Sequence, residues 1–368
     1  MIVKRFRAEN FRNIEACDIE FSPGVNLLYG QNAQGKTNVI EGIYYFSRGK
    51  SFRGREDKEL VRFGSEGFRI SVDYEDGDSS GNLEYAMFGR ERLRKKNGYK
   101  LKGVTEMLGS FRAVLFYPDD LSLVKDGPEE RRSFLNVAVS TCYSAYVRYY
   151  ADYKKALENR NCILKMMQKG LQVDQKELDS WSSSMAEYAS HIYLMRRDYV
   201  ERLKVYAGEV MRDISDGNEE LRLSYESHIS PDITDRASVK SEYERILSSS
   251  LDREVAAGVS LYGPHREEIS IEINGKSARS FASQGQQRSI VLAMKLAEGE
   301  VIREICGNYP VFLFDDVLSE LDDKRRKYVL DGIGEKQIII TACNKGECIG
   351  YTDSEIEVTG GRYVSSHR

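Results

Sequence analysis

The stretch Gly30-Gln31-Asn32-Ala33-Gln34-Gly35-Lys36-Thr37 has the form Gly-x-x-x-x-Gly-Lys-Thr and decides the fold of the chain. The apolar run at residues 25–29 before it predicts a buried strand, and residues 38–46 after it have apolar side chains at helical spacing. Strand, glycine pattern and helix in that order are typical of a phosphate-binding loop. An ordinary glycine-rich turn would reproduce part of this pattern, but here every fixed position and both flanks match. We therefore predict a nucleotide-binding protein.

The residues of the loop have separate expected roles. Its glycines let the backbone turn so that several N–H groups point inward, and the helix N-terminus adds positive potential. Lys36 is expected to reach the β- and γ-phosphates, and the Thr37 hydroxyl to hold Mg²⁺. The polar turn at residues 10–13 either touches the nucleotide through Arg12 or only connects two strands. The predicted nucleotide contacts in this half of the site are Gly30, Gln31, Asn32, Ala33, Gln34, Gly35, Lys36, Thr37, Asn38 and Arg12.

A second half of the site is predicted near the other end of the chain. Ser283-Gln284-Gly285-Gln286-Gln287 opens an amphipathic helix, although this pattern alone is also explained by Ser283 as an ordinary N-cap. Residues 311–316 form an apolar run that ends in Asp315 and Asp316, and ligands gather at the carboxyl ends of parallel strands. We expect Asp315 to bind the Mg²⁺ held by Thr37, directly or through water, and Asp316 to polarise the attacking water.

Length and composition set limits on the class of protein. The 368 residues, 41% of them hydrophobic, suffice for two domains or for one large domain with an inserted lobe. No apolar run approaches the roughly 20 residues that span a bilayer, and the first residues lack the apolar segment of a signal peptide. Six scattered cysteines predict free thiols in a reducing cytoplasm. A net charge of −4 means that any nucleic-acid surface must be local.

The sequence predicts an α/β fold in three consecutive parts. Residues 1–117 hold the phosphate loop and antiparallel strands, with alternating patterns at 68–101. Residues 118–255 are expected to form an inserted, mostly helical lobe, because residues 127–215 contain almost no proline or glycine. In residues 256–368 predicted strands and helices alternate again, and they complete the nucleotide-binding domain.

Three further features each have a functional and a plainer interpretation. Residues 90–102 carry seven Lys and Arg side chains against one acid, and they would contact a phosphate backbone or form only a solvated face. His265 follows a Gly-Pro turn and is more simply structural than catalytic. Tyrosines at helical steps would stack bases or, as we favour, pack a helix pair; they are Tyr143, Tyr146, Tyr150 and Tyr153.

The order of these parts resembles that of an ATP-binding-cassette ATPase: phosphate loop, inserted lobe, Ser-x-Gly-x-Gln helix, acidic strand end, the Ser319-Glu320-Leu321-Asp322 loop and a final strand. Transporter subunits of this class generally have a shorter insertion, and chromosome-condensing and double-strand-break-repair relatives have long coiled coils instead. With its compact insertion, the chain resembles the RecF family of the SMC/Rad50-like superfamily over essentially its whole length. The other phrases that carry the resemblance lie at residues 10–13, 116–121, 127–135, 263–266 and 313–322.

The departures from the family pattern are small. Asn136 and Glu267 stand where the family usually has aspartate. The segment Thr341-Ala342-Cys343 lacks the histidine that transporter-type cassettes have after the last strand, so the γ-phosphate sensor stays unassigned.

The resemblance implies an ATP-dependent homodimer that clamps double-stranded DNA and single-/double-strand junctions at gaps. Weak, DNA-stimulated ATP hydrolysis would reset the clamp. Ser283, Gly285, Gln286 and Asp322 of one copy would contact the ATP held by the other copy, which makes Asp316, Lys36 and Ser283 the candidate catalytic residues. The resemblance further implies recombinase loading with the mediators RecO and RecR, in SOS-linked repair and replication restart in the cytoplasm, at the nucleoid and without a membrane partner.

Two rival functions follow from the same motifs. An energy-coupling ATPase subunit of a membrane transporter shares the site, but the long insertion, the basic run and aspartate at position 316 count against it. A structural clamp with an inactive ATPase would result if Asp316 is too short to place water. Steady-state ATP turnover with and without DNA separates these functions.

Overall fold

The computed structural model describes residues 1–54, 56–332, 334–348 and 350–367, which form two compact units. Unit 1 consists of Met1–Ser122, Tyr206–Glu219 and Ser283–Arg368, and unit 2 of Leu123–Val205 and Glu220–Ala282. These limits differ from the lobe predicted at residues 118–255. Residues 220–282 stay together because the strand that starts at Glu268 pairs with the strand that starts at Leu221, a long-range contact without a local sequence signal.

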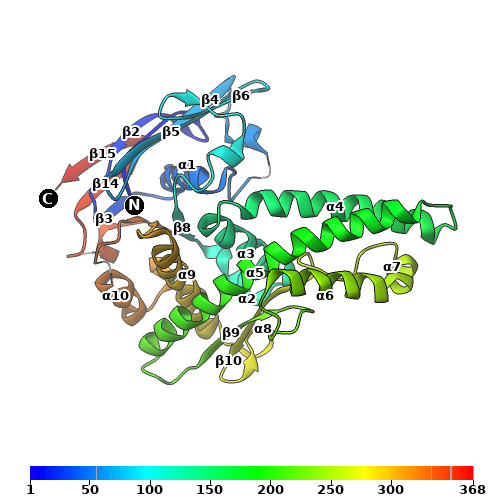
Figure 1. The fold of residues 1–368 in the computed structure, drawn as a ribbon. Helices are drawn as coiled ribbons and strands as arrows, with labels where there is room; N and C mark the ends of the chain where they lie inside the picture. Colours follow the sequence, from blue (N-terminus) through cyan, green and yellow to red (C-terminus); the bar gives the residue numbers. More distant parts are fainter. Residues whose placement is uncertain (55, 333, 349, 368) are drawn as a thin grey trace. The chain divides into compact units, whose positions relative to one another are not determined.

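A mostly parallel sheet carries the phosphate loop of unit 1. Its strand order is β15-β14-β3-β13-β12-β8, with only β15 antiparallel to its neighbour. Figure 1 shows the red C-terminal strands beside the blue β3, so residues from early and late in the chain share one sheet. Its central strands are mostly apolar and almost fully buried, as expected for a sheet that is covered on both faces. The strands are β3 Val25–Tyr29, β8 Ala113–Phe116, β12 Val311–Asp315, β13 Ile338–Ala342, β14 Ser354–Thr359 and β15 Arg362–His367.

The register of this sheet positions the two halves of the predicted site. Strand β13 pairs with β3 on one side, through Ile340 and Leu27, and with β12 on the other, through Ile340 and Phe314. The strands run parallel, so their carboxyl ends meet at one edge. The phosphate loop after β3 and the carboxylates that end β12 are therefore only one strand apart.

A second sheet in unit 1 is antiparallel, with the order β2-β1-β4-β5-β6-β7. It confirms the antiparallel strands predicted from the alternation at residues 68–101. Phe6, Phe11 and Phe68 are fully buried in the core beneath it. The strands are β1 Ile2–Phe11, β2 Ile14–Glu20, β4 Gly67–Asp76, β5 Ser79–Phe88, β6 Glu91–Lys96 and β7 Tyr99–Lys100.

Helix α1, Lys36–Arg48, is buried on almost every side and shares one apolar core with both sheets. Its glycine Gly42 lies against Phe6, and a Cβ there would be 2.4 Å from the phenylalanine ring. This close approach fixes the helix beneath β1. The start of α1, which is the end of the phosphate loop, is held rigidly as a result.

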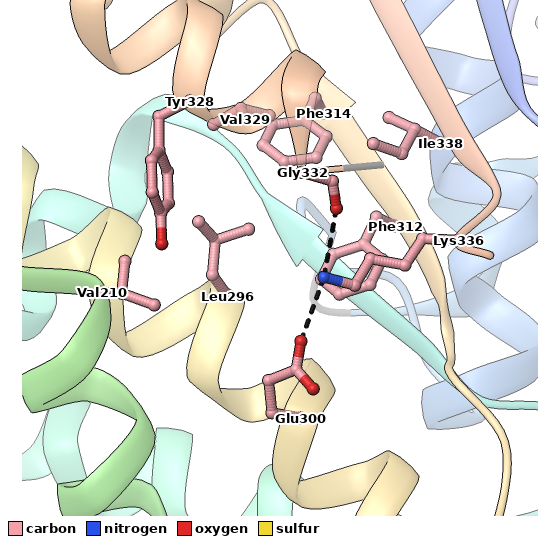
Figure 2. Close-up of a pocket in the computed structure, with 10 residues that line it drawn as sticks. All are labelled: Val210, Leu296, Glu300, Phe312, Phe314, Tyr328, Val329, Gly332, Lys336 and Ile338. Atoms are coloured by element: carbon pink, nitrogen blue, oxygen red, sulfur yellow. Dashed lines mark hydrogen bonds and ion pairs between the residues drawn. The ribbon is translucent and has the colours of Figure 1, made fainter. Parts of the chain in front are cut away.

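Unit 1 contains further helices besides α1. They are η1 Asp57–Leu60, η2 Val104–Glu106, η3 Pro118–Leu121, α9 Gln284–Cys306, η4 Leu318–Glu320, α10 Asp323–Asp331, η5 Lys345–Cys348 and the end of α5, Gln175–Ile214. Figure 2 shows a small cavity of about 80 Å³ among α5, α9, α10 and β12. Leu296, Phe312 and Phe314 give it apolar walls, and Lys336 closes one side through an ion pair with Glu300 at 3.0 Å. We regard it as a packing cavity.

A buried carboxylate on α9 makes the stability of unit 1 depend on pH. Glu298 is buried, and its Oε2 atom has no hydrogen-bond partner among the described residues. Lys295, one turn earlier, pairs instead with Asp120 at 3.1 Å. Burial therefore raises the pKa of Glu298 from 4.5 to about 7, although Lys295 opposes the shift. Between these values the folded chain binds more protons than the unfolded chain, so stability falls as pH rises.

We expect the substitution Glu298→Gln to stabilise the protein at pH 8, by about 1–3 kcal/mol, because the buried charge is removed. Below pH 4.5, where the wild-type carboxyl is protonated in both states, the gain should vanish. Melting temperatures at both pH values measure the effect. The exposed residue Glu91 offers a control variant, Glu91→Gln. An equal gain at both pH values would contradict the assignment.

Unit 2 is mostly helical and contains a three-stranded sheet in the order β11-β10-β9. Its helices are α2 Ser122–Lys125 except for Ser122, α3 Pro128–Cys142, α4 Tyr146–Gln168, α5 up to Val205, α6 Arg236–Ser249, α7 Leu251–Ala257 and α8 Ala278–Phe281. Its strands are β9 Leu221–Glu226, β10 Glu268–Ile273 and β11 Lys276–Ser277.

A buried hydrogen-bond network occupies the core of unit 2. Tyr146 and Tyr153 are buried, which confirms helix packing as their role. His265 bonds the Tyr153 hydroxyl at 2.6 Å and the Ser260 carbonyl at 3.0 Å, and burial lowers its pKa to about 4. It is therefore a structural residue, as the plainer interpretation predicts.

The two family departures both lie in this network. The Asn136 side-chain oxygen accepts hydrogen bonds from Arg196 and Tyr146. Glu267 accepts from Tyr225, Tyr243 and Ser227. Both substitutions are thus accommodated by donors that satisfy the side chain present.

Candidate nucleotide site

The phosphate loop connects the end of β3 to the start of α1 in a strained conformation. Gly30, Ala33 and Gly35 have φ angles of 153°, 63° and 112°. A Cβ on Gly30 would lie 2.2 Å from the Val358 carbonyl, and one on Gly35 would lie 2.9 Å from Asn13 Oδ1. Glycine is therefore required at both positions. Such a turn at a helix N-terminus presents backbone N–H groups to an anion.

Lys36 folds back over this loop. Its Nζ donates hydrogen bonds to the carbonyls of Gly30 at 2.6 Å and Gln31 at 3.1 Å, and the residue is only 4% exposed. The ammonium group therefore stays at the centre of the turn. A positive charge in this place suits a polyphosphate.

Thr37 meets the end of β12 across the intervening strand. Its hydroxyl donates to Asp315 Oδ1 at 2.9 Å, and Thr341 on β13 donates to the same oxygen at 2.9 Å. Burial raises the pKa of Asp315. Thr341 also accepts the backbone N–H of Asp316 at 2.9 Å, and Asp316 has a φ of 53°. Local patterns did not indicate a role for Thr341. The signal that could have found it is its position near the end of β13, the strand between β3 and β12.

The donors at this edge fit Mg²⁺. A hydroxyl and a carboxylate are hard oxygen ligands, and Mg²⁺ is usually held by one or two such groups together with water and phosphate oxygens. Among the described residues there is no group of three or more His, Cys, Asp or Glu side chains that could hold a metal. A Mg²⁺ ion at this edge would take its other ligands from phosphate oxygens and water, as Mg²⁺ usually does.

The turn after β1 forms a side wall. Arg12 lies there as predicted, but its guanidinium group pairs with the buried Glu41 and also donates to the Glu59 carbonyl at 2.8 Å. Asn13 donates to the Ala33 carbonyl at 3.1 Å and accepts from Asn38 at 2.6 Å. Arg12 thus lines the cavity and braces the wall, whereas Asn13 contacts the loop itself.

These elements enclose an open cavity of about 700 Å³. Three cations, Lys36, Arg12 and Arg53, outnumber two acids, Glu59 and Asp316, among its lining residues, which favours an anionic ligand. The full lining is Arg12, Asn13, Asn32, Ala33, Gly35, Lys36, Thr37, Asn38, Arg53, Glu59, Val61, Phe63 and Asp316. Asn13 belongs to the turn at residues 10–13 that the sequence offers as a possible nucleotide contact, whereas local patterns did not single out Arg53, Glu59, Val61 and Phe63. Gln31 contributes its carbonyl to Lys36, and the Gln34 side chain accepts a bond from the Gly360 N–H.

The second half of the predicted site begins at the exposed start of α9. Ser283 Oγ accepts from the Gln286 N–H at 3.3 Å, and Gln286 Oε1 accepts from the Ser283 N–H at 2.9 Å, a capping box. Asp322 caps α10 in the same way by accepting from the Arg325 N–H. Ser283, Gly285, Gln286 and Asp322 do not line the cavity of their own chain.

A buried parallel sheet, a phosphate loop after β3, carboxylates after β12 and the capped Ser-x-Gly-x-Gln helix together define the head fold of an ATP-binding-cassette ATPase. A solved Smc head domain from Pyrococcus furiosus, 17% identical, has the same fold at a TM-score of 0.57, with 99% of this chain and 96% of that chain covered. No helix in the described part of the chain combines the length and apolarity that a bilayer crossing requires.

Known proteins place the chain within this class. Residues 2–360 match the RecF/RecN/SMC N terminal domain family. The DNA replication and repair protein RecF of Clostridioides difficile (strain 630) is 36% identical, with 93% of this chain and 91% of that protein covered. The RecF of Thermoanaerobacter sp. (strain X514) is 35% identical, with 98% and 99% covered. A solved structure of the recombination mediator protein RecF with ATPrS, in the RecFOR pathway, is 35% identical with a TM-score of 0.91, covering 99% of this chain and 98% of that chain. The chain belongs to the RecF family.

Proposed function

We propose that this protein binds ATP with Mg²⁺ and uses the nucleotide to control its hold on DNA during recombinational repair and replication. The observation that carries the proposal is the bond between the Thr37 hydroxyl and Asp315 at 2.9 Å, beside a loop centred on Lys36. Solved structures of RecF with ATPrS and with ATP, both 35% identical to this chain, support ATP as the nucleotide.

The residues at the edge of the sheet divide the chemistry among them. Mg²⁺, held by Thr37 and Asp315, would neutralise charge that develops on the phosphates. Lys36 binds and orients the β- and γ-phosphates. Asp316 lines the same cavity and polarises the attacking water. Aspartate is one methylene shorter than glutamate, which suits weak hydrolysis that DNA binding stimulates.

The position of Ser283 supports a dimeric active form. Ser283 and Gly285 are exposed at the N-terminus of α9 and do not line the cavity of their own chain. The positive end of that helix would meet the γ-phosphate held by a second copy. Gln286 and Asp322, which cap α9 and α10, would lie at the same interface. Two ATP molecules would then be buried between two subunits, and hydrolysis would release the contact between the subunits.

The biological setting follows from the same relatives. Their names concern DNA replication and repair, and the solved RecF structures belong to the RecFOR pathway. We infer that the dimer clamps duplex DNA and single-/double-strand junctions, and that it acts with RecO and RecR in SOS-linked repair at the bacterial nucleoid in the cytoplasm. The transporter alternative is not favoured, because the likeness to RecF spans nearly the whole chain. An inactive clamp differs from our proposal in having no ATP turnover, with or without DNA.

The basic run is a candidate DNA surface, and the structure changes which of its residues matter. Arg92 pairs with Asp57 at 3.3 Å, and Lys95 with Glu84 at 3.3 Å. Lys96 donates to Ser110. The exposed cations at the ends of the β6–β7 hairpin are Arg90, Lys100 and Lys102.

The experiment that tests this function is DNA binding with and without ATP. Wild type should bind duplex DNA more tightly with ATP, and alanine at Arg90, Lys100 and Lys102 should weaken that binding about 10-fold. The slope of log K against log salt should fall by up to about 2.7, because three phosphate contacts are lost. Alanine at Lys155, Lys165 and Lys176, which are exposed in unit 2, removes the same charge elsewhere. If both triple variants lose the same amount of DNA affinity, the hairpin is only a solvated face. If wild type binds DNA equally well without ATP, the nucleotide does not control the hold on DNA.

A further inference from the structure

The exposed aromatic residue Phe63 lines the nucleotide cavity without having a role in holding phosphate or metal. It is 100% exposed, so its ring faces are free to contact a ligand. Other exposed aromatic residues in unit 1, such as Phe88 and Tyr99, do not line this cavity. We propose that Phe63 is the surface on which the base of the bound nucleotide stacks. This inference rests on the function proposed above and adds the base-recognition residue to it.

The hydrogen bonds of the wall place Phe63 beyond the phosphate-binding part of the cavity. Asn13 contacts the phosphate loop at the Ala33 carbonyl, whereas Arg12, the residue before it, contacts the Glu59 carbonyl at 2.8 Å and the Leu60 carbonyl through its backbone at 2.7 Å. The wall therefore runs from the loop, along Asn13 and Arg12, to the segment that carries Phe63. A nucleotide with its phosphates on the loop would extend its base along this wall.

The segment that carries Phe63 is held in place on both sides. The Arg62 N–H donates to the Asn10 carbonyl at 2.8 Å, which fastens the segment to the end of β1. The Ser65 N–H donates to the Arg62 carbonyl at 3.0 Å and closes a turn in which Gly64 has a φ of 82°. That conformation favours glycine and puts Phe63 at the tip of the turn. The backbone that carries the aromatic ring is therefore already ordered before a base stacks on it.

The chemistry around Phe63 suits a base better than a further phosphate. Val61, the other apolar lining residue of this segment, lies two residues before it. Stacking of a base on an aromatic side chain contributes about 1–3 kcal/mol, which corresponds to about 5- to 150-fold in affinity. It accepts any base, because every base presents a π-face. Stacking therefore assigns affinity to Phe63 and does not by itself select adenine.

The test compares ATP with inorganic tripolyphosphate, which has the phosphates without the base. Calorimetry with Mg²⁺ should show Phe63→Ala binding ATP about 10-fold or more weakly than wild type, with unchanged affinity for tripolyphosphate. Phe88→Ala, which removes an exposed phenylalanine elsewhere in unit 1, should change neither. Unchanged ATP affinity, or an equal loss for both ligands, would overturn the inference. So would a variant that keeps ATP affinity and loses only self-association. Failure of wild type to bind ATP would instead refute the proposed function.

Fluorescence provides an independent measurement. The chain has one tryptophan, Trp181, so Phe63→Trp combined with Trp181→Phe places a single reporter on the turn. Saturating ATP should quench its emission by stacking, and tripolyphosphate should leave the emission unchanged. Emission that responds to neither ligand, or equally to both, would show that no base lies on this ring.

Discussion

Replacing Lys36 with alanine is expected to weaken ATP binding about 100-fold or more. The carbonyls of Gly30 and Gln31 hold the ammonium group at the centre of the phosphate loop. There the phosphate oxygens would accept hydrogen bonds from it. A charge-assisted hydrogen bond contributes about 1.5–3 kcal/mol, and two of them account for a loss of this size. Calorimetry with ATP and Mg²⁺ measures the effect.

Two controls separate the lost charge from lost folding. The exposed residue Lys58 pairs with Glu56 in its own segment and does not line the nucleotide cavity, so Lys58→Ala should bind ATP as wild type does. The melting temperature of the Lys36→Ala protein shows whether the loop still folds without its lysine. A folded Lys36→Ala protein with normal ATP affinity would refute the assignment of the phosphate loop.

The second large effect concerns dimerisation, and two substitutions should act in opposite directions. Ser283→Arg should leave ATP binding nearly intact, because Lys36 and Thr37 belong to the subunit that holds the nucleotide. It should block ATP-induced dimers, because a bulky side chain at the exposed start of α9 fills the space meant for the partner's phosphate. Asp316→Asn should instead keep the Mg²⁺ contacts of Thr37 and Asp315 and slow hydrolysis about 100-fold, since general-base groups contribute about 10²- to 10⁴-fold. It should accumulate as an ATP-bound dimer.

Light scattering with ATP and Mg²⁺, together with steady-state ATP turnover, measures both variants. Ser283→Ala is the milder comparison: it removes the N-cap, at about 1 kcal/mol, and the serine's contact to the partner's ATP, but it does not fill the interface, so it should dimerise less than wild type and more than Ser283→Arg. A Ser283→Arg protein that forms ATP-dependent dimers would contradict the role of α9. Wild-type turnover by Asp316→Asn would show that another group activates the water.

Local sequence patterns were sufficient for the fold class and for the family. The phosphate loop, the apolar strand ending in Asp315 and the helix after Ser283 are each read from neighbouring residues, because periodicity and turn chemistry act over a few positions. Burial on both faces accounts for the mostly apolar sequences of β3, β12 and β13, which made the parallel sheet predictable. The α/β fold of an ATPase head is confirmed by the structure and its likeness to RecF.

What the tertiary structure alone decided are pairings between residues far apart in the chain. Strand register brings Thr341 to Asp315, and it gives Thr37 its carboxylate partner. The Arg12 guanidinium pairs with Glu41, an ion pair that no local pattern predicts.

The same holds at the hairpin, at the edge of unit 2 and in the nucleotide cavity. Asp57 and Glu84 neutralise part of the basic run, and β9 retains residues up to Ala282 in unit 2. Phe63 lines the cavity because it lies in the turn that Gly64 allows. The physical reason is common to all of these cases. The sequence gives the chemistry of each side chain. The partner of a side chain depends on how strands and helices that are distant along the chain pack together.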